Sequence, residues 1–549
     1  MSDKNIKRRE FLKSVLAGAS VLALDWNSFP KGSGKGAGQD AGKTDFDAVI
    51  IGSGLGGLSC AAAFARQGFK PLVLEQHYVP GGYATTFKRP GGFVFDVSLH
   101  STSVGEQERL EKIIPGFPEI KGIEYVPHPY LYRVIYPDYD IRVPQKDLQG
   151  YINTLVKLFP EEKEGIEGIF EDMKGLNDDI SKYSRAGGRI NMSTFAQDYP
   201  YLSRSFARTW GSMLDARIKN IKLKAVISAL WGYYGLPPSK LSCFYYALPT
   251  ISYLQEGGYY IKGRSQAMSN AMVKYIEELG GKVMLRKRVE KILTKDHTAY
   301  GVQTADKNIY TAKVIVSNAN AYDTFHRMLD EGDYLKDYLA RMDRYSVSLS
   351  SFQVFLGLKK DLVGGLGLKD TEVFYETGYD MEESFKRMVD GDVENEGFGL
   401  MLYDNLYSDY SPKGKNTITL ITSQGYDFWK KYESDYFKGN KKEYRKEKER
   451  IADILIKKAE ENLLPSLSKA IEVKEIGTPL TNVRYTSNYR GAIYGWDQTL
   501  DNSPPRRMPH NTPIRNLYLS GAWTSPGGGY GAVLGSGLEC FGLIMREWQ

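Results

Sequence analysis

Three glycines at a fixed spacing, Gly52, Gly54 and Gly57, are the residues of this chain that most directly predict a chemistry. In the pattern Gly-x-Gly-x-x-Gly, the first glycine permits a tight turn, the second lets the backbone approach a pyrophosphate, and the third brings a helix close to a strand. The N-terminus of the following helix then offers free N–H groups to the phosphates. The motif therefore predicts a bound dinucleotide cofactor.

A carboxylate follows where ribose recognition requires one. Glu75 lies 18 residues beyond Gly57, close to the roughly 20 residues typical of an acidic side chain that accepts hydrogen bonds from ribose hydroxyls. An acidic residue at this place favours an unphosphorylated ribose, and so FAD or NAD. The alternative is a glycine-rich turn without a ligand, and a second glycine pair, Gly81 and Gly82, argues against it.

Short elements around the motif supply the framework that it needs. Residues 48–51 form a β-branched apolar run, residues 58–66 are small and have helical spacing, and residues 71–74 form a second apolar run. This order of strand, tight turn, helix and strand is that of a dinucleotide-binding unit.

Composition and charge exclude several other classes of protein. Lys plus Arg number 72 and Asp plus Glu number 66, a net charge of +6, and the basic residues of 441–458 alternate with glutamates. We interpret that segment as the solvated face of a long helix, so no nucleic-acid partner is expected. The three cysteines, Cys60, Cys243 and Cys540, and six scattered histidines lack ligand spacing, so we expect no metal.

The N-terminal residues read as a targeting segment and a linker. Residues 1–29 contain Arg8 and Arg9 followed by Phe11-Leu12-Lys13 and a short apolar run, which resembles a bacterial twin-arginine export signal. Residues 30–44 are rich in glycine and predict a flexible linker. We therefore expect an exported protein, periplasmic or membrane-associated; an ordinary basic start would leave it cytoplasmic.

Beyond the first motif, the chain resembles a known family of flavoproteins. Glu75-Gln76-His77, Gly81-Gly82 and the segment from Phe95-Asp96 to His100 are similar to the N-terminal signature of phytoene desaturases, carotenoid isomerases and retinol saturases. The saturase and isomerase branch is the more similar one. The resemblance runs from Phe46 to Trp548 and implies FAD as the cofactor.

The middle of the chain carries the next similar block, Gly257 to Ala319. Here the resemblance implies that the backbone of Val289 meets the adenine. The chain departs from the family pattern at Ile261 and Arg264. Arg264 either neutralises an acidic group of a substrate or flavin phosphate, or is a surface charge at the start of a helix.

A second glycine cluster lies near the C-terminus. Gly521-Ala522-Trp523 ends a strand, and the run Pro526 to Gly531 precedes a helix predicted over 532–546. The resemblance places the flavin pyrimidine ring at this helix start. Its positive end would stabilise negative charge on a reduced ring.

Periodicity predicts the elements between these blocks. Amphipathic helices are expected at 148–158 and 166–180, and strands at 93–99, 130–136, 349–358, 372–375 and 417–422. An aromatic region follows residue 225, and its tyrosines either line an apolar tunnel or belong to the core. These tyrosines are Tyr233, Tyr234, Tyr245, Tyr246, Tyr253, Tyr259 and Tyr260.

The expected fold class is α/β, a discontinuous Rossmann-type FAD-binding domain with an interleaved α+β substrate domain on a mixed sheet. The FAD-binding domain takes residues 45–105, 255–325 and 475–549, and the substrate domain takes 106–254 and 326–474. The cofactor-binding residues that we expect are Gly52, Gly54, Gly57, Glu75, Gly81, Gly82, Tyr83, Val289, Gly521, Ala522 and Gly531.

The resemblance implies an FAD-dependent oxidoreductase that acts on C=C bonds of an apolar conjugated substrate such as a carotenoid or retinoid. Hydride transfer to or from flavin gives desaturation, saturation or isomerisation, with His100 as the single catalytic candidate. No second dinucleotide motif is apparent, so a quinone or redox protein is the expected electron partner, and contact with a membrane surface is a further expectation. An amine or amino-acid oxidase and a non-catalytic polyene-binding flavoprotein remain alternatives.

Overall fold

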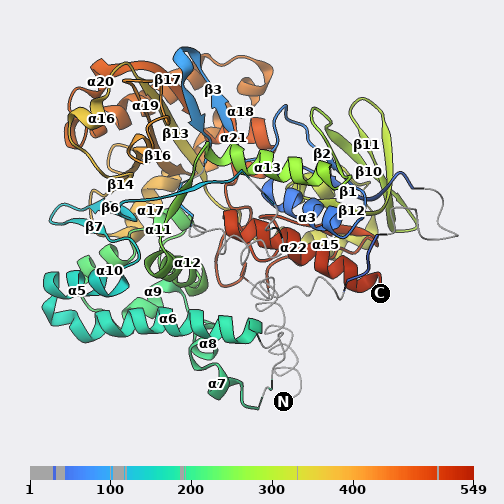
Figure 1. Cartoon of the computed structure of the whole chain (residues 1–549), viewed down its shortest axis with the longest axis horizontal. Helices are drawn as coiled ribbons and strands as arrows, with labels where there is room; N and C mark the ends of the chain where they lie inside the picture. Colours follow the sequence, from blue (N-terminus) through green and yellow to red (C-terminus); the bar gives the residue numbers. More distant parts are fainter. Residues whose placement is uncertain are drawn as a thin grey trace.

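The computed structural model describes residues 29–32, 44–98, 100–102, 117, 120, 122–185, 191, 193–330, 332–503 and 506–549. Two seven-stranded sheets organise this part of the chain. In Figure 1 the first sheet lies on the right beside α3, α13 and α22, and the second lies at the upper left with the helices of the C-terminal half.

The first sheet is parallel at its centre. Its strands are β1 (Phe46–Ile51), β2 (Pro71–Leu74), β9 (Lys282–Met284), β10 (Val289–Lys295), β11 (Thr298–Thr304), β12 (Ile309–Ser317) and β18 (Leu517–Leu519). The parallel strands run in the order β18-β12-β1-β2-β9, and β11 and β10 extend the sheet antiparallel from the first half of β12.

Both faces of this sheet are covered, as its nearly continuous apolar strands require. Along β1, Ala48 and Ile50 pack into the core that contains the helices α3 (Leu55–Arg66) and α22 (Tyr530–Glu547), while Val49 and Ile51 face the opposite core. Helix α13 (Arg264–Glu278) packs beside α3. The predicted strands at 48–51 and 71–74 and the helix at 58–66 are therefore confirmed.

The second sheet is mixed, as predicted. Its strands are β6 (Tyr132–Ile135), β7 (Asp140–Val143), β13 (Ser350–Leu358), β14 (Glu372–Tyr375), β15 (Phe398–Met401), β16 (Asn416–Gln424) and β17 (Ile471–Gly477). The order is β17-β13-β16-β15-β14-β6-β7, with β14 and β6 parallel and the other neighbours antiparallel.

Alternation along these strands separates a core from a cavity. In β13, Phe352 and Val354 pack in the core that also holds α18 (Tyr426–Lys438) and α19 (Lys442–Asn462), whereas Gln353 and Phe355 line a cavity on the other face. The apolar side expected for the helix near 441–458 is that of α19, whose Tyr444, Ile451, Leu455 and Ala459 are buried.

Helices cover the cavity side. They are α5 (Leu148–Leu158), α6 (Lys163–Arg185), α7 (Phe195–Asp198), α8 (Pro200–Ser205), α9 (Trp210–Asp215), α10 (Ile221–Ile227), α11 (Trp231–Tyr234) and α12 (Cys243–Glu256). The remaining helices are α14 (Ala321–His326), α15 (Lys336–Met342), α16 (Leu362–Gly365), α17 (Met381–Asp390), α20 (Leu467–Ala470) and α21 (Pro479–Thr486). Two small antiparallel sheets pair β3 (Thr86–Lys88) with β4 (Val94–Asp96) and β5 (Tyr125–Pro127) with β8 (Tyr259–Ile261).

The predicted helix at 148–158 and strand at 372–375 agree residue for residue with α5 and β14, but the strand predicted at 93–99 was too long. Its regular part, β4, ends at Asp96, whose buried carboxylate accepts hydrogen bonds from Tyr260 and from Ser265 at the start of α13. The contact with Ser265 thus ties the end of β4 to α13.

The two sheets are interleaved along the sequence. Strands of the first sheet come from 46–74, 282–317 and 517–519, and strands of the second come from 132–143 and 350–477. The fold is thus a discontinuous Rossmann-type unit with an inserted α+β unit on a mixed sheet, while the exact domain bounds remain a prediction.

Most of the predicted signal segment and linker lies outside the described residues. The described part, 29–32, is packed: Phe29 lies edge-on against Phe541, and the N–H of Gly32 donates to the carbonyl of Gln67 at 2.8 Å. The expectation of a flexible linker was therefore wrong for its first residues. Among the helices of the described part, none is long and apolar enough to cross a bilayer.

Candidate functional site

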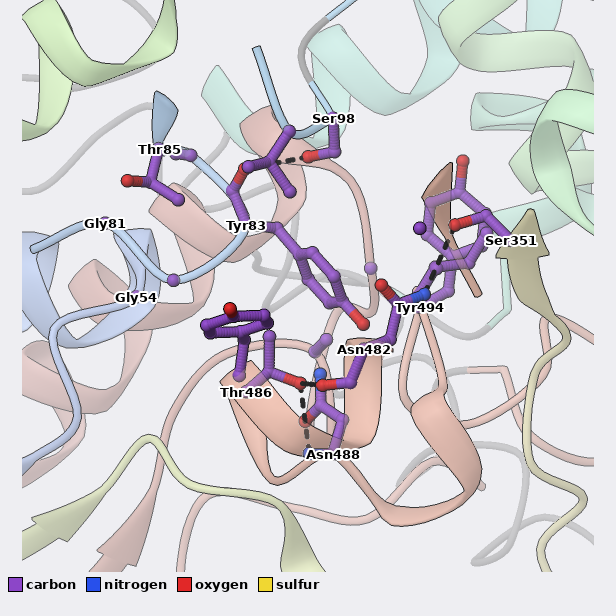
Figure 2. Close-up of a pocket in the computed structure, with 18 of the residues that line it drawn as sticks. Gly54, Gly81, Tyr83, Thr85, Ser98, Ser351, Asn482, Thr486, Asn488 and Tyr494 are labelled. Atoms are coloured by element: carbon purple, nitrogen blue, oxygen red, sulfur yellow. Dashed lines mark hydrogen bonds between the residues drawn. The ribbon is translucent and has the colours of Figure 1, made fainter. Parts of the chain in front are cut away.

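A cavity of about 1040 Å³ lies between the two sheets. It begins at the carboxyl ends of the parallel strands, where ligands of such sheets bind, and continues between the second sheet and helices α11 and α12. Its volume exceeds the upper end of the roughly 300–1,000 Å³ typical of small-molecule pockets, which leaves room for two ligands. Figure 2 shows the region where the first glycine turn, Tyr83 and the α21 segment face one another.

The first glycine turn has the geometry that the motif predicts. Gly52 has a φ of +92°, a conformation that L side chains rarely adopt, and a Cβ on Gly57 would lie 2.2 Å from the carbonyl oxygen of Gly52. No side chain caps α3 at Gly54. The N–H groups of the first turn of α3 are therefore free to meet an anion.

Glu75 is held in place at the end of β2. One carboxylate oxygen accepts hydrogen bonds from the N–H and the hydroxyl of Ser53 at 2.8 and 2.7 Å, and the other accepts one from the N–H of His77 at 2.8 Å. A carboxylate has about four acceptor positions, so one remains for a ribose hydroxyl. Ser53 was not among the predicted residues, although it lies within the motif.

The second glycine pair folds back onto the first turn. Gly81 donates its N–H to the carbonyl of Ser53 at 3.0 Å, and a Cβ on Gly82 would lie 3.2 Å from the Cα of Gly54. Tyr83 follows, and its ring points across the cavity toward Thr486 and Asn488 (Figure 2). Its hydroxyl donates to the carbonyl of Ala492 at 3.2 Å, and burial raises the pKa of Tyr83 to about 12, so the phenol is neutral.

The C-terminal glycine cluster lies beside the first glycine turn, at the start of α3. A Cβ on Gly56 would lie 2.8 Å from the Cα of Gly521, because β1 and β18 both pair with β12 and end at the same edge of the sheet. Helix α22 begins at this edge with no side-chain cap and packs on α3, since a Cβ on Gly537 would lie 2.3 Å from the carbonyl oxygen of Gly56. The two ends of the chain therefore form one site.

The other predicted cofactor residues also line this cavity. Val289 begins β10 and is 5% exposed, and Gly531 stands in the first turn of α22 with nothing within 4 Å of an added Cβ. The carbonyl of Ala522 accepts a hydrogen bond from Arg507 at 2.6 Å. Buried Arg507 also donates to the carbonyls of Trp496 and Thr524, so it holds together the two segments that flank Ala522.

Asn318 is a cavity residue that the sequence did not single out. It follows β12, and its side chain lies close enough that a Cβ on Gly54, Gly56 or Gly521 would meet its amide at 2.8, 2.7 or 2.4 Å. No local pattern marks it, because its neighbours come from three distant parts of the chain.

These features fit a dinucleotide. The backbone at two uncapped helix starts is open to phosphate and ring oxygens, glycines keep Cβ atoms out of the turn, and a fixed carboxylate stands where a ribose would lie. The residues present are thus those that FAD requires, and they span the carboxyl edge of the first sheet.

His100 lines the cavity beside the aromatic half. Its ring lies edge-on to Tyr233 with the centroids 5.0 Å apart, and Nδ1 has no hydrogen-bond partner in the described part of the chain. Burial lowers the pKa of His100 to about 4, because the charged form loses its hydration. The imidazole is therefore neutral at pH 7.

Some tyrosines of the aromatic region line the cavity and others belong to the core, the two roles that the sequence left open. Tyr233, Tyr234, Tyr245 and Tyr253 line the cavity. Tyr246, Tyr259 and Tyr260 are buried in the core instead. Phe244, Leu248, Phe355, Phe374, Phe398 and Ile421 complete an apolar wall.

Arg264 fits neither of its two predicted roles. It is 7% exposed, so it is not a surface charge, and it does not line the cavity. Its guanidinium lies 4.1 Å from the ring centroid of Tyr410 and donates to that residue's carbonyl. Within the described ranges no three His, Cys, Asp or Glu side chains come together as a metal site.

Comparison with known proteins places this geometry in a family. The chain is 28% identical to an all-trans-retinol 13,14-reductase of Danio rerio over 92% of this chain and 86% of the relative, and 27% identical to prolycopene isomerase 1 of an Oncidium hybrid cultivar over 92% and 85%. The resemblance noted in the sequence is therefore confirmed.

Solved structures agree on the fold. A cyclohexylamine oxidase from Brevibacterium oxydans superposes with a TM-score of 0.57 at 14% identity, covering 92% of this chain and 99% of the oxidase. The model of the family described as flavin containing amine oxidoreductase matches residues 55–540. The chain thus belongs to the flavin-containing amine oxidoreductase family and is an FAD-dependent oxidoreductase.

Proposed function

We propose that this oxidoreductase acts on C=C bonds of a lipophilic polyene, of the carotenoid or retinoid type, by hydride transfer to or from FAD. The observation that carries the proposal is the aromatic half of the cavity, whose walls on α11, α12 and β13–β16 bear no charged side chain. Such walls suit an apolar, extended ligand. The names of the retinol reductase and the prolycopene isomerase point to the same chemical class.

In this proposal the glycine turns and helix ends hold the cofactor. Gly52 and Gly54 leave room for the pyrophosphate at α3, and Gly57, which does not line the cavity, lets α3 pack against the turn. Glu75 accepts from a ribose hydroxyl, and Gly81, Gly82 and Tyr83 cover the turn. Val289, which lines the cavity, would meet the adenine. Gly521, Ala522 and Gly531 take the ring end.

Bound FAD supplies the exchange of a hydride with a substrate carbon. The protein contributes position and exclusion of water, since an unsubstituted polyene offers no group for acid or base work. The N-terminus of α22 stabilises negative charge placed against it. His100 lines the cavity between the cofactor and the aromatic half, and its neutral ring adds no charge there.

Two other functions use the same scaffold. An amine oxidase needs a charged carboxylate or an aromatic cage for its cationic substrate, and the solved amine oxidases share only the fold with this chain at identities below 25%. A flavin-containing binding protein that carries a polyene without turnover requires the same cavity. The experiment below separates all three.

A basic rim supports contact with an anionic membrane surface. Lys441, Arg445, Lys448 and Arg484 line one mouth of the cavity and make no ion pair within the described part of the chain. Burial and the three other cations lower the pKa of Lys441. Exposed aromatic rings stand on adjoining segments, with Phe437 52% and Tyr485 48% exposed. Cations beside exposed aromatic side chains favour a lipid interface.

We also propose that the chain is exported by the twin-arginine route, on the basis of residues 1–29. Outside the cytoplasm soluble nicotinamide cofactors are absent. A quinone or a redox protein then exchanges electrons with the flavin.

The test is an anaerobic single turnover. Photoreduced holoprotein is mixed with a retinoid or carotenoid, and the flavin and polyene absorption bands are followed together. Flavin reoxidation with loss of a polyene double bond is expected for saturation, and a changed polyene band with unchanged flavin for isomerisation. Oxidised holoprotein is mixed with the same polyenes in parallel, and flavin reduction there is expected for desaturation. Hydrogen peroxide formed from amines in air would instead establish the oxidase, and no spectral change with any polyene in either flavin state would establish the binding protein.

A further inference from the structure

A single carboxyl group interrupts the apolar half of the cavity. Glu376 follows β14 and lines the cavity, and no hydrogen bond or ion pair of its side chain is found in the described part of the chain. Every other cavity residue on α11, α12, α17 and β13–β16 is uncharged. A half-buried carboxyl without a partner is costly unless a ligand pairs with it.

The strand directs this side chain. Glu376 continues the pairing of β14 with β6, since its N–H donates to the carbonyl of Ile135 at 2.8 Å. Successive side chains alternate between faces, so Glu376 lies on the same face as Phe374, which also lines the cavity. Tyr375 between them packs against the opposite core, as does Val373 on the other side of Phe374.

The neighbouring backbone leaves space for the carboxyl. A Cβ on Gly397 would lie 3.0 Å from Oε2 of Glu376, so a glycine stands where a side chain would crowd this oxygen. Met388 on α17 lines the cavity as well, and its Cε would lie 3.6 Å from a Cβ added to Gly232 on α11.

The charges around Glu376 are already paired with other groups. Glu396 accepts from Arg387 at 3.3 Å, and the ammonium of Lys458 donates to the carbonyls of Val393 and Glu394 at 3.2 Å. Burial, with Glu396 adding to it, raises the pKa of Glu376 to about 8. The protonated carboxyl is both a donor and an acceptor.

A path of rings connects this carboxyl with the flavin end. Phe374 lies edge-on to Tyr233 with the centroids 6.1 Å apart, and Tyr233 lies edge-on to His100 at 5.0 Å. A rod-like ligand that fills this path has its far end at Glu376.

We propose that Glu376 binds a hydroxyl or carbonyl oxygen at the end of the polyene, so that the substrate is an oxygenated polyene and not a plain hydrocarbon. This inference rests on the proposed function and adds the end group to it. Glu376 is a specificity-determining residue, distant from the reacting carbons.

Matched pairs of ligands test it. Dissociation constants of zeaxanthin and β-carotene, and of retinol and deoxyretinol, are measured by ligand absorbance on the FAD-loaded protein. The members of each pair differ only in hydroxyl groups, one at each end of zeaxanthin and one in retinol. Wild type is expected to bind the hydroxylated member about tenfold more tightly, the factor that one buried hydrogen bond supplies.

Glu376→Leu should abolish this preference without weakening the hydrocarbon, and Glu376→Gln, which keeps a donor and an acceptor, should retain most of it. Glu383→Gln is the charge control, because this α17 glutamate is exposed and does not line the cavity. Flavin content verifies folding of each variant.

Equal affinities within both pairs in wild type, or a preference unchanged in Glu376→Leu, would overturn the inference while leaving the proposed function intact. Failure of all four ligands to bind would refute both.

Discussion

Buried titratable groups, some of them in the cavity, affect how this protein should respond to pH. His100 and His128 lie in surroundings that favour the neutral ring, and burial lowers the pKa of each, to about 4 and about 3. In the unfolded chain both have an ordinary pKa of about 6.5. Below that pH the unfolded state binds protons at these two rings that the native state does not, so their contribution to stability is full above pH 6.5 and is lost as pH falls.

We expect the buried neutral ring of His100 to lower the free energy of unfolding by about 2 kcal/mol between pH 7 and pH 5, while buried carboxyls with a raised pKa, such as Glu376, act in the opposite direction. Urea unfolding of His100→Gln should therefore differ from that of wild type by about this amount over the same pH range. The exposed His297 provides the control, because His297→Gln should leave the pH dependence as in wild type. The same pH dependence in His100→Gln as in wild type would show that its ring is not buried neutral.

A second pH response belongs to Glu376, whose pKa lies near 8. An aldehyde end group only accepts hydrogen bonds, so its binding needs the protonated carboxyl. The affinity for retinal should therefore fall as pH rises through 8, whereas retinol, which can also donate to a carboxylate, should bind with little change. Titration of both ligands from pH 6.5 to 9.5 measures this, and parallel curves would count against the assigned role.

At the scale of elements, the contact between α3 and α22 joins the two ends of the chain. Gly537 and Gly535 lie on the same helix but differ in surroundings: a Cβ would meet the carbonyl of Gly56 at 2.3 Å from position 537, and nothing within 4 Å from position 535. Both glycines cost helix stability relative to alanine.

Gly537→Ala should separate α22 from α3, lowering stability by about 1–3 kcal/mol and releasing FAD. Gly535→Ala, the matched control, should raise stability by up to about 1 kcal/mol through helix propensity. Thermal unfolding and the flavin-to-protein absorbance ratio measure both effects. Equal behaviour of the two variants would contradict the close helix contact.

Elements with one apolar face could be predicted from the sequence, and those without one could not. The helix at 148–158 agrees with α5 because only one side of it is buried. Helix α12 was interpreted only as an aromatic region, since it is apolar on most sides and contains Pro249, so no helical period stands out. Similarly, the glycine turns were predictable because their chemistry is local, whereas Asn318 and Glu376 owe their places to contacts between distant strands.

At the scale of the whole molecule, the basic rim should govern attachment to membranes. The double variant Lys441→Glu/Arg445→Glu reverses two cavity-lining charges on or beside α19, and Lys442→Glu/Lys446→Glu reverses two exposed charges that do not line the cavity. Both change the net charge equally.

Co-sedimentation with vesicles that contain phosphatidylserine should weaken at least tenfold in the first double variant, because each lysine or arginine near an anionic surface contributes about 1 kcal/mol. The second double variant should lose much less, and salt should weaken binding of the wild type. Equal losses would assign the attraction to net charge and not to the rim.

The most direct test of the account is a crystal structure of the FAD-loaded protein with a bound polyene. We predict the pyrophosphate at the start of α3, the ribose at Glu75, the flavin ring against the start of α22, and the polyene between α11, α12 and the second sheet. A dinucleotide elsewhere, or a polyene outside the cavity between the two sheets, would contradict the account.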